Sequence, residues 1–326
     1  MVDPATPGLG RPIDACDIKS PYTAGALRGG SHVHVFSPDS SMISFTYEDY
    51  VLTQLRHNPN VDWNQRNVGV SVLGKLVTVP KSHPRNHDGD AFSVVVTTTH
   101  NQPKPGSDEI QRAYEDAWVG TNGYIDQDGR WQPHALAFLG DCVGANKQVV
   151  TELFLVDLPA KLNRPGNGPL QGTSTRRPFA PSGCRQRRMT FTESRTYPGI
   201  TGPRHWPRSH PDGSQIAIIM NDDKGIGQLF LVATATGSIR QLTKLPYSVA
   251  SAFTWSPDGS SIAFIAKDCV VIADAETGTA RHVTRPLTPA PRPEACVFSP
   301  DGKWITIVQR HQFGDGEWNQ ISIVAV

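Results

Sequence analysis

The chain has 326 residues, and its 31 basic and 30 acidic side chains give a formal net charge of +1 at pH 7. A balance this even implies no nucleic-acid or membrane-surface partner, and no apolar run approaches the ~20 residues that span a bilayer. The 29 glycines and 27 prolines favour a fold with many short strands and many turns.

Cysteine usage and the first residues bear on the compartment. The five cysteines are an odd number without a Cys-x-x-Cys spacing, which argues against a disulfide framework or a zinc knuckle. The segment after Met1 reads as a loop and lacks the basic-then-apolar order of a signal peptide. We therefore expect a reducing, cytoplasmic setting.

A short apolar strand that runs into a Pro-Asp turn occurs four times along the chain. The turns lie at 36–39, 209–213, 255–259 and 298–302. In the last three the turn aspartate recurs at intervals of about 45 residues, and repeats of this size with about four strands each are typical of β-propeller blades. The pattern predicts an all-β fold, a β-propeller of four-stranded antiparallel blades that forms a single domain over residues 1–326.

Period-2 apolar runs separated by Gly and Asp turns divide the chain into about five blades. The expected blades cover residues 28–82, 88–192, 200–244, 249–285 and 292–326. The last three are regular and the first two are looser.

Two segments interrupt the repeat. Residues 101–133 form a long insertion in which Ile110, Ala113, Tyr114, Ala117 and Trp118 fall on one helical face, after an N-cap at Ser107. This pattern predicts a short amphipathic helix over 107–118. The stretch 159–187, rich in Pro, Gly, Arg and Ser, is expected to be an irregular exposed excursion.

The turn prolines give a register for comparing blades. In a propeller of this strand order the strand before the Pro-Asp turn lines the central channel. Six positions before each turn proline stand His32, His205, Ser251 and Glu294, and His34 lies two residues after His32. Two histidines and a glutamate are thus expected at equivalent positions of three blades.

A His-x-His pair on a strand puts both rings on one face, a spacing that suits first-row divalent metals. With His205 and Glu294 the set predicts a metal site for Mn²⁺, Fe²⁺, Ni²⁺ or Zn²⁺. The competing interpretation is that these histidines bond water or a neighbouring strand on a wet channel wall.

Arginines flank the histidines, Arg28 before His32 and Arg204 before His205. An arginine at a channel mouth could hold a substrate carboxylate through two parallel hydrogen bonds. Arg28 and Arg204 are therefore the predicted catalytic or substrate-holding residues. A solvated or blade-bridging role is the alternative for both.

The blades resemble TolB-type (PD40) propeller repeats. More specifically, the segments 28–39, 105–115, 197–200 and 203–206 resemble a family of bacterial propeller proteins, DUF3748, over nearly the whole chain. Members of that family carry further amino-terminal blades, so the resemblance implies a shortened form of a six- or seven-bladed propeller.

The family is in turn similar to oligogalacturonate lyase, a propeller that holds a manganese-type ion on channel histidines. That likeness implies His32, His34 and His205 as metal ligands. The lyase also has a glutamine ligand close before its His-x-His pair, and residues 28–31 contain no glutamine.

Two functions follow from these observations. The first is a metal-binding propeller that cleaves acidic oligosaccharides by metal-assisted β-elimination. Its channel would hold the oligosaccharide or another small anionic ligand. The second is a non-catalytic interaction platform that binds a protein partner on one propeller face, with the segment around Tyr114 and Trp118 as the contact.

Overall fold

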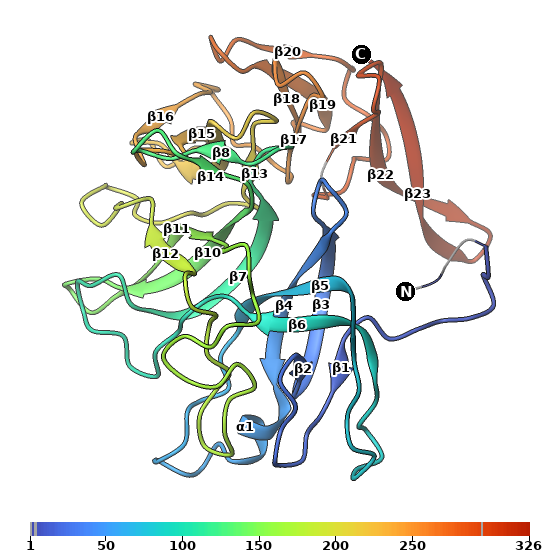
Figure 1. The fold of residues 1–326 in the computed structure, drawn as a ribbon. Helices are drawn as coiled ribbons and strands as arrows, with labels where there is room; N and C mark the ends of the chain where they lie inside the picture. The colour runs from blue at the N-terminus through green and yellow to red at the C-terminus, as the bar shows by residue number, and fades with distance from the viewer. Residues whose placement is uncertain (1, 3–4, 295) are drawn as a thin grey trace. The chain divides into compact units, whose positions relative to one another are not determined.

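Five antiparallel sheets follow one another along the computed structural model, which describes residues 2, 5–294 and 296–326 (Figure 1). The first sheet holds β3 (Gly29–Phe36), β4 (Met42–Asp49), β5 (Asn67–Val77) and β6 (Gly89–Val95). The second holds β7 (Ile110–Trp118), β10 (Ala135–Val143), β11 (Val149–Asp157) and β12 (Arg185–Arg188). Both are meanders in which strands adjacent in the chain, apart from the insertion after β7, are adjacent in the sheet.

The carboxy-terminal half repeats this order. The third sheet holds β13 (Arg208–Ser209), β14 (Gln215–Asn221), β15 (Gly227–Ala233) and β16 (Ile239–Gln241). The fourth holds β17 (Thr254–Trp255), β18 (Ser261–Ala266), β19 (Cys269–Asp274) and β20 (Ala280–His282). The fifth holds β21 (Val297–Phe298), β22 (Trp304–Phe313) and β23 (Gly316–Ala325). These sheets are β-propeller blades, and the predicted all-β fold of about five blades is confirmed.

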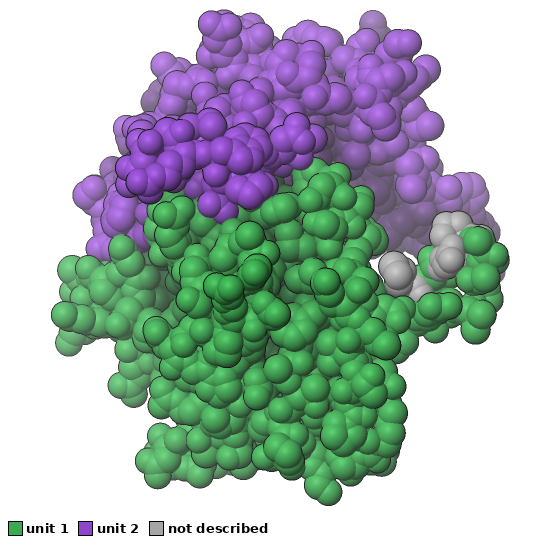
Figure 2. All heavy atoms as spheres, viewed as in Figure 1, with its two compact units in different colours: residues 1–118, 134–149, 154–187 green, residues 119–133, 150–153, 188–326 purple. Residues whose placement is uncertain are grey.

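The remaining elements are short. They are β1 (Ala15–Cys16), β2 (Ala26–Leu27), the helix α1 (Tyr50–Gln54), β8 (Tyr124–Ile125) and β9 (Trp131–Gln132). No helix of the described residues is long and apolar enough to cross a membrane. The chain divides into two compact units (Figure 2), residues 1–118, 134–149 and 154–187 in the first and 119–133, 150–153 and 188–326 in the second.

The Pro-Asp turns are built from local hydrogen bonds. In the fourth sheet the Ser256 hydroxyl donates to Asp258 Oδ1 (2.5 Å), and the amide of Ser260 donates to the same oxygen (3.0 Å). These bonds lower the pKa of Asp258 to about 2, with the Ser256 hydroxyl as the largest cause. Gly259 takes φ 75°, a conformation that glycine adopts without strain. The recurring motif is therefore structural.

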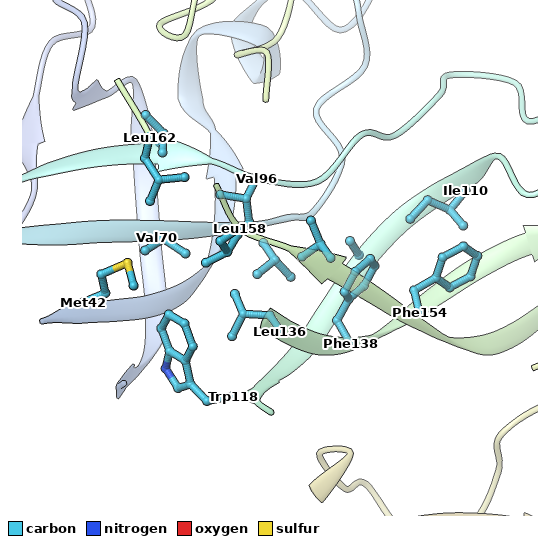
Figure 3. Close-up of a cluster of buried hydrophobic side chains, with 14 of the residues drawn as sticks. Met42, Val70, Val96, Ile110, Trp118, Leu136, Phe138, Phe154, Leu158 and Leu162 are labelled. Atoms are coloured by element: carbon cyan, nitrogen blue, oxygen red, sulfur yellow. The ribbon is translucent and has the colours of Figure 1, made fainter. Parts of the chain in front are cut away.

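The core of the first unit lies between the first and second sheets (Figure 3). Met42 and Val70 from the first sheet meet Leu136, Phe138 and Phe154 from the second, and all are buried. The Phe138 and Phe154 rings stack with centroids 5.7 Å apart. Apolar residues on facing strands thus join these two blades, the packing by which stacked sheets bury a common core.

The helix predicted over 107–118 is wrong, because residues Ile110–Trp118 form β7. Its pairing with β10 is irregular at two places, and at each of them β7 has one residue more than β10. Each extra residue stretches the two-residue alternation to a spacing of three, which imitates the apolar pattern of a helix. Trp118 is buried and donates from Nε1 to the Val35 carbonyl (3.0 Å), so this segment lies inside the unit.

The boundary between the first two blades also differs from the expectation. The apolar run at 93–96 was expected in the second blade, but it ends β6, the fourth strand of the first sheet. The second sheet starts only at Ile110.

The stretch 159–187 is irregular but packed. Leu162 and Leu170 are buried in the core of the first unit. The Arg177 side chain donates to Asp62, Gln65 and Asn101, which lie more than 70 residues earlier in the chain. The excursion is thus fastened to the first unit by apolar and by charged side chains.

Candidate functional site

The His-x-His segment lies at an irregularity of β3. Pairing with β4 runs from Gly29 to His32 and resumes at Val35, and between them Val33 has φ 58°. A β-branched residue in this region is a genuine outlier and costs on the order of 1–3 kcal/mol. Because a bulge bends its strand and re-aims the side chains that follow, the two histidine rings do not obey simple strand alternation.

His34, directly after the strained residue, contacts an acid that sequence reasoning missed. Its Nε2 lies 3.1 Å from Ser31 Oγ and 3.6 Å from Asp14 Oδ2. The Ser31 hydroxyl donates to Asp14 Oδ2 (2.7 Å), so this hydroxyl accepts from His34 when Nε2 carries the proton.

Asp14 gathers three serine hydroxyls from three strands of the first sheet. Besides Ser31 on β3, Ser71 on β5 donates to Oδ1 (2.5 Å) and Ser93 on β6 donates to Oδ1 (2.7 Å). Burial by itself would raise the pKa of Asp14, but the hydrogen bonds from His34 and the three serines together lower it. The carboxylate is therefore held ionised and well satisfied.

A pocket of about 580 Å³ opens beside this carboxylate. Its basic and acidic lining residues are Arg11, Asp14, His34, Arg85 and His87, and we name it the Asp14 pocket. The Arg85 guanidinium carbon lies 4.2 Å from the centroid of the Tyr50 ring. Stacking of this kind supports the flat face of a guanidinium and leaves its N–H edges for a planar acceptor such as a carboxylate.

The pocket exists because the segment before β1 lies directly on the first sheet. The amides of Asp90 and Ala91 donate to the carbonyls of Pro12 (3.2 Å) and Ile13 (3.0 Å). At Gly89 a β-carbon would lie 2.1 Å from the Ala15 amide nitrogen, so only glycine allows this close approach. β6 thereby carries Asp14 onto the face of the sheet where Ser71 and Ser93 point.

A second buried acid lies at a matching irregularity on β7. Glu115 has φ 55°, and the next residue, Asp116, is 1% exposed. Thr46 Oγ1 donates to its Oδ1 (3.4 Å), while Oδ2 has no hydrogen-bond partner among the described residues. Burial raises the pKa of Asp116 to about 6, against smaller lowering effects from Ser44, Thr46 and His34. A buried carboxyl with a raised pKa is typical of functional sites.

Arg28 is not placed as a substrate ligand. Its side chain is 0% exposed, forms an ion pair with Asp49, and donates to the carbonyls of Thr173 and Arg176. These bonds occupy all three guanidinium nitrogens inside the first unit and fasten the 159–187 excursion to β4.

The other predicted site residues belong to the second unit. His205 is buried, its Nδ1 lies 2.8 Å from the Pro203 carbonyl, and its Nε2 accepts from the Ile219 amide (3.1 Å). Burial lowers its pKa to about 4, so the ring is neutral. Arg204 is exposed and lies over the Trp206 ring, with its guanidinium carbon 4.8 Å from the centroid.

Glu294 pairs with Arg292, whose Nη2 lies 2.9 Å from Oε1. Among residues 2, 5–294 and 296–326, no group of three or more His, Cys, Asp or Glu is placed to hold a metal ion. His205 would have to give up a hydrogen bond and Glu294 an ion pair to act as ligands. A metal site on His32, His34, His205 and Glu294 stays a prediction, because these residues belong to two different units.

Sequence reasoning found His34 but not its surroundings. Asp14 lies outside every predicted blade, and Arg85 lies in the loop between two of them. Asp116 stood within the segment interpreted as a helix. One signal in the sequence could have indicated a polar site here. Serines stand among the apolar residues of β5 and β6, at Ser71 and Ser93.

Comparison with known proteins finds a relative that covers most of this chain. It is 45% identical to the uncharacterized protein YidR of Escherichia coli (strain K12) over 304 residues, which cover 92% of this chain and 69% of that protein. Residues 1–87 match the family model described as "Protein of unknown function (DUF3748)".

Solved structures are similar at lower identity. A puromycin-hydrolyzing peptidase of Mycobacterium tuberculosis aligns with a TM-score of 0.41 and 15% identity, over 87% of this chain and 35% of that one. A putative TolB from Agrobacterium tumefaciens aligns with a TM-score of 0.39 and 13% identity, over 92% and 78%. With its family-model match and its 45% identity to YidR, the chain belongs to the DUF3748 family.

Proposed function

We propose that the chain is a ligand-binding propeller that holds a small anionic molecule, of the acidic-sugar class, in the Asp14 pocket. The observation that supports this is the lining of the pocket, in which Arg11, His34, Arg85 and His87 surround one acid. That acid already accepts three serine hydroxyls, so its lone pairs are not offered to a ligand.

Arg85 is the residue that we expect to bind the ligand carboxylate. It is exposed and rests on Tyr50, which limits the rotamers that it must give up on binding. A bidentate arginine–carboxylate pair is stronger than a neutral hydrogen bond and fixes the plane of the ligand. An aromatic platform below the guanidinium therefore serves both affinity and orientation.

His34 complements this contact. When Nε2 donates to Ser31, the Nδ1 lone pair is an acceptor for a ligand hydroxyl. A uronate presents a carboxylate and hydroxyls on one sugar ring. Uronates are also the ligand class that the resemblance to oligogalacturonate lyase implies.

Calorimetric titration with galacturonate oligomers tests the proposal, with neutral galactose as the ligand control. Arg85→Gln should weaken uronate binding by roughly 10- to 100-fold, because a hydrogen bond to a charged group contributes about 1.5–3 kcal/mol. Arg56→Gln is the matched control, since Arg56 is also exposed in the first unit but does not line the pocket. Equal binding by galactose, or an unchanged affinity in Arg85→Gln, would contradict the proposal.

Metal-assisted β-elimination on such a ligand stays a prediction, and the proposed binding does not require it. Elemental analysis of the wild type beside the His32→Ala/His34→Ala variant measures the metal, and the ultraviolet absorbance of unsaturated products measures turnover. A stoichiometric ion that the variant loses would favour the elimination. The interaction platform would gain support if no uronate bound and a protein partner were captured instead.

A further inference from the structure

The first unit has another pocket, of about 320 Å³, beside the irregular stretch 159–187. One wall is the segment that follows β6, residues 97–101, together with Asp62. The other wall is formed by residues 176–180 of the irregular stretch. All lining residues belong to the first unit, and we name this the Arg176 pocket.

Hydrogen bonds within the unit hold the two walls together. The Asp62 amide donates to the Thr175 carbonyl (2.9 Å). The Gln186 side chain pairs with the backbone of Thr98, since it accepts from the Thr98 amide (2.8 Å) and donates to the Thr98 carbonyl (3.1 Å). The form of the pocket therefore depends on contacts inside the first unit.

The pocket carries a positive charge that no acid of its walls balances. The stretch 159–187 contains neither Asp nor Glu, and its basic residues are Lys161, Arg164, Arg176, Arg177, Arg185 and Arg187. Arg177 donates from its amide (3.0 Å) and from Nε (3.3 Å) to Asp62 Oδ2, so these two side chains neutralise each other. The Arg176 Nε lies 3.5 Å from the same oxygen, and 59% of its side chain is exposed. The charge that remains is therefore on Arg176.

Hydrogen-bond acceptors in the wall at 97–101 are already occupied. The carbonyl oxygens of residues 98–100 each accept a side-chain N–H, in turn from Gln186, Arg177 and Gln65. Asn101 Oδ1 accepts twice, from the Trp63 amide (2.9 Å) and from Arg177 Nη2. A ligand that needs to donate hydrogen bonds therefore gains little from these groups.

Donors of the pocket, by contrast, lack acceptors among the residues that the structure describes. Because Asn101 Oδ1 takes two donors, the orientation of this amide is set and its Nδ2 hydrogens are left for a ligand. His100 Nδ1 is buried without a partner. Since unpaired buried N–H groups are rarer than unpaired acceptors, the proton belongs on Nε2, which the ring offers to the pocket. Arg176 adds the Nη edge of its guanidinium.

We propose that the Arg176 pocket binds a phosphate group, either of a small phosphate ester or of free phosphate. A phosphate ester carries about −1.5 to −2 charges at pH 7 and three strong acceptor oxygens, whereas a carboxylate has two oxygens. This matches free donors, occupied acceptors and one unbalanced arginine. The volume lies at the lower end of the range of roughly 300–1,000 Å³ for small-ligand sites. The inference does not rest on the proposed uronate binding, because the two pockets share no lining residue.

Calorimetric titration of the whole chain with inorganic phosphate and with glucose 6-phosphate, at fixed pH and ionic strength, tests the proposal. Acetate is the ligand control and should bind at least about 10-fold more weakly. Arg176→Gln should weaken phosphate binding by roughly 10- to 100-fold, as loss of a hydrogen bond to a charged group does. Arg164→Gln is the matched control, because Arg164 is an exposed arginine of the same stretch that does not line the pocket. It should keep the wild-type affinity.

A further variant tests the opposite wall. Asn101→Asp keeps an oxygen that can accept from Trp63 and Arg177, but it replaces the Nδ2 donor by a negatively charged oxygen. Phosphate binding should therefore weaken by more than about 10-fold. Thermal unfolding followed by circular dichroism checks that each variant keeps the wild-type fold.

The two phosphate ligands separate the two sources of the group. Tighter binding of glucose 6-phosphate than of inorganic phosphate would support an ester, and equal binding would support free phosphate. A wild type that binds neither, or that binds acetate equally well, would overturn the proposal. So would wild-type affinity in Arg176→Gln or Asn101→Asp, or a loss in Arg164→Gln as large as that in Arg176→Gln.

Discussion

Asp116 shows how a single buried group can make stability depend on pH. Its pKa is raised from 3.8 to about 6 by burial, so the folded chain binds a proton more tightly than the unfolded chain does. The stabilisation is fully present below pH 4 and is lost as pH rises through 6. Its size is roughly 3 kcal/mol, from 1.36 kcal/mol for each unit of pKa.

Asp116→Asn should therefore be more stable than the wild type above pH 7 and about equally stable at pH 4. The expected observation is a shallower fall of the unfolding free energy between pH 4 and pH 7, measured by denaturant titration. Asp108→Asn is the control, because Asp108 is an exposed acid shortly before β7, where changes stay within about 0.5 kcal/mol. An identical pH profile for Asp116→Asn and wild type would show that Asp116 does not carry the effect.

Arg28 provides another prediction for a buried charge. It pairs with Asp49 and holds two carbonyls of the 173–176 segment, far apart in the chain. Arg28→Met should cost about 3–5 kcal/mol, because it leaves the Asp49 carboxylate buried without its partner. Limited proteolysis should then cut within 159–187.

Arg66→Met is the comparison for that change. Arg66 pairs with Glu48 at 3.0 Å, but both side chains are substantially exposed. Pairs of this kind contribute about 0–1 kcal/mol. If the two variants lost similar stability in denaturant titration, the anchoring role of Arg28 would be wrong.

At the scale of elements, the hairpin between β18 and β19 has a turn that its sequence does not favour. Ala266 pairs with Cys269, and the two residues between them, Lys267 and Asp268, have φ of 49° and 60°. Two left-handed residues define a type I′ turn, for which Asn-Gly is preferred.

Asp268→Gly should therefore stabilise the chain by about 0.5–1 kcal/mol. Relief of left-handed strain of roughly 1–2 kcal/mol outweighs the greater freedom of glycine in the unfolded state. Asp223→Gly, at a turn residue without positive φ, should be neutral or destabilising. A lower melting temperature for Asp268→Gly would contradict this account.

Regular elements could be predicted from the sequence, whereas irregular ones could not. The strands of the third to fifth sheets follow their apolar alternation, and the Pro-Asp turns mark where they reverse. β7 was not predicted as a strand, because two extra residues stretched its apolar alternation to the spacing of a helix. Periodicity measures spacing along the chain, and a bulge changes that spacing without changing the structure type.

The candidate site was less predictable for a related reason. His34 was singled out by its register, but Asp14, Ser31 and Arg85, which line the pocket with it, come from a segment before the first blade, from β3 and from a loop. Such a combination depends on tertiary contacts, which no pattern within one strand encodes. Likewise, the burial of Arg28 depends on a segment about 145 residues away in the chain.

At the scale of the molecule, facing apolar residues join the sheets within each unit, the first to the second and the third to the fourth and fifth. The Asp14 pocket forms where the segment before β1 crosses the first sheet. In the second unit, one face of the fifth sheet packs on the fourth. The proposed binding of an anionic ligand therefore depends on residues of the first unit alone.

The three serines that meet at Asp14 also bear on how this protein can evolve. Loss of one hydroxyl removes one bond and leaves the carboxylate with two serine donors. Loss of the acid removes the shared acceptor of all three hydroxyls at once. We therefore expect position 14 to tolerate fewer substitutions than Ser31, Ser71 or Ser93, each of which can be lost alone.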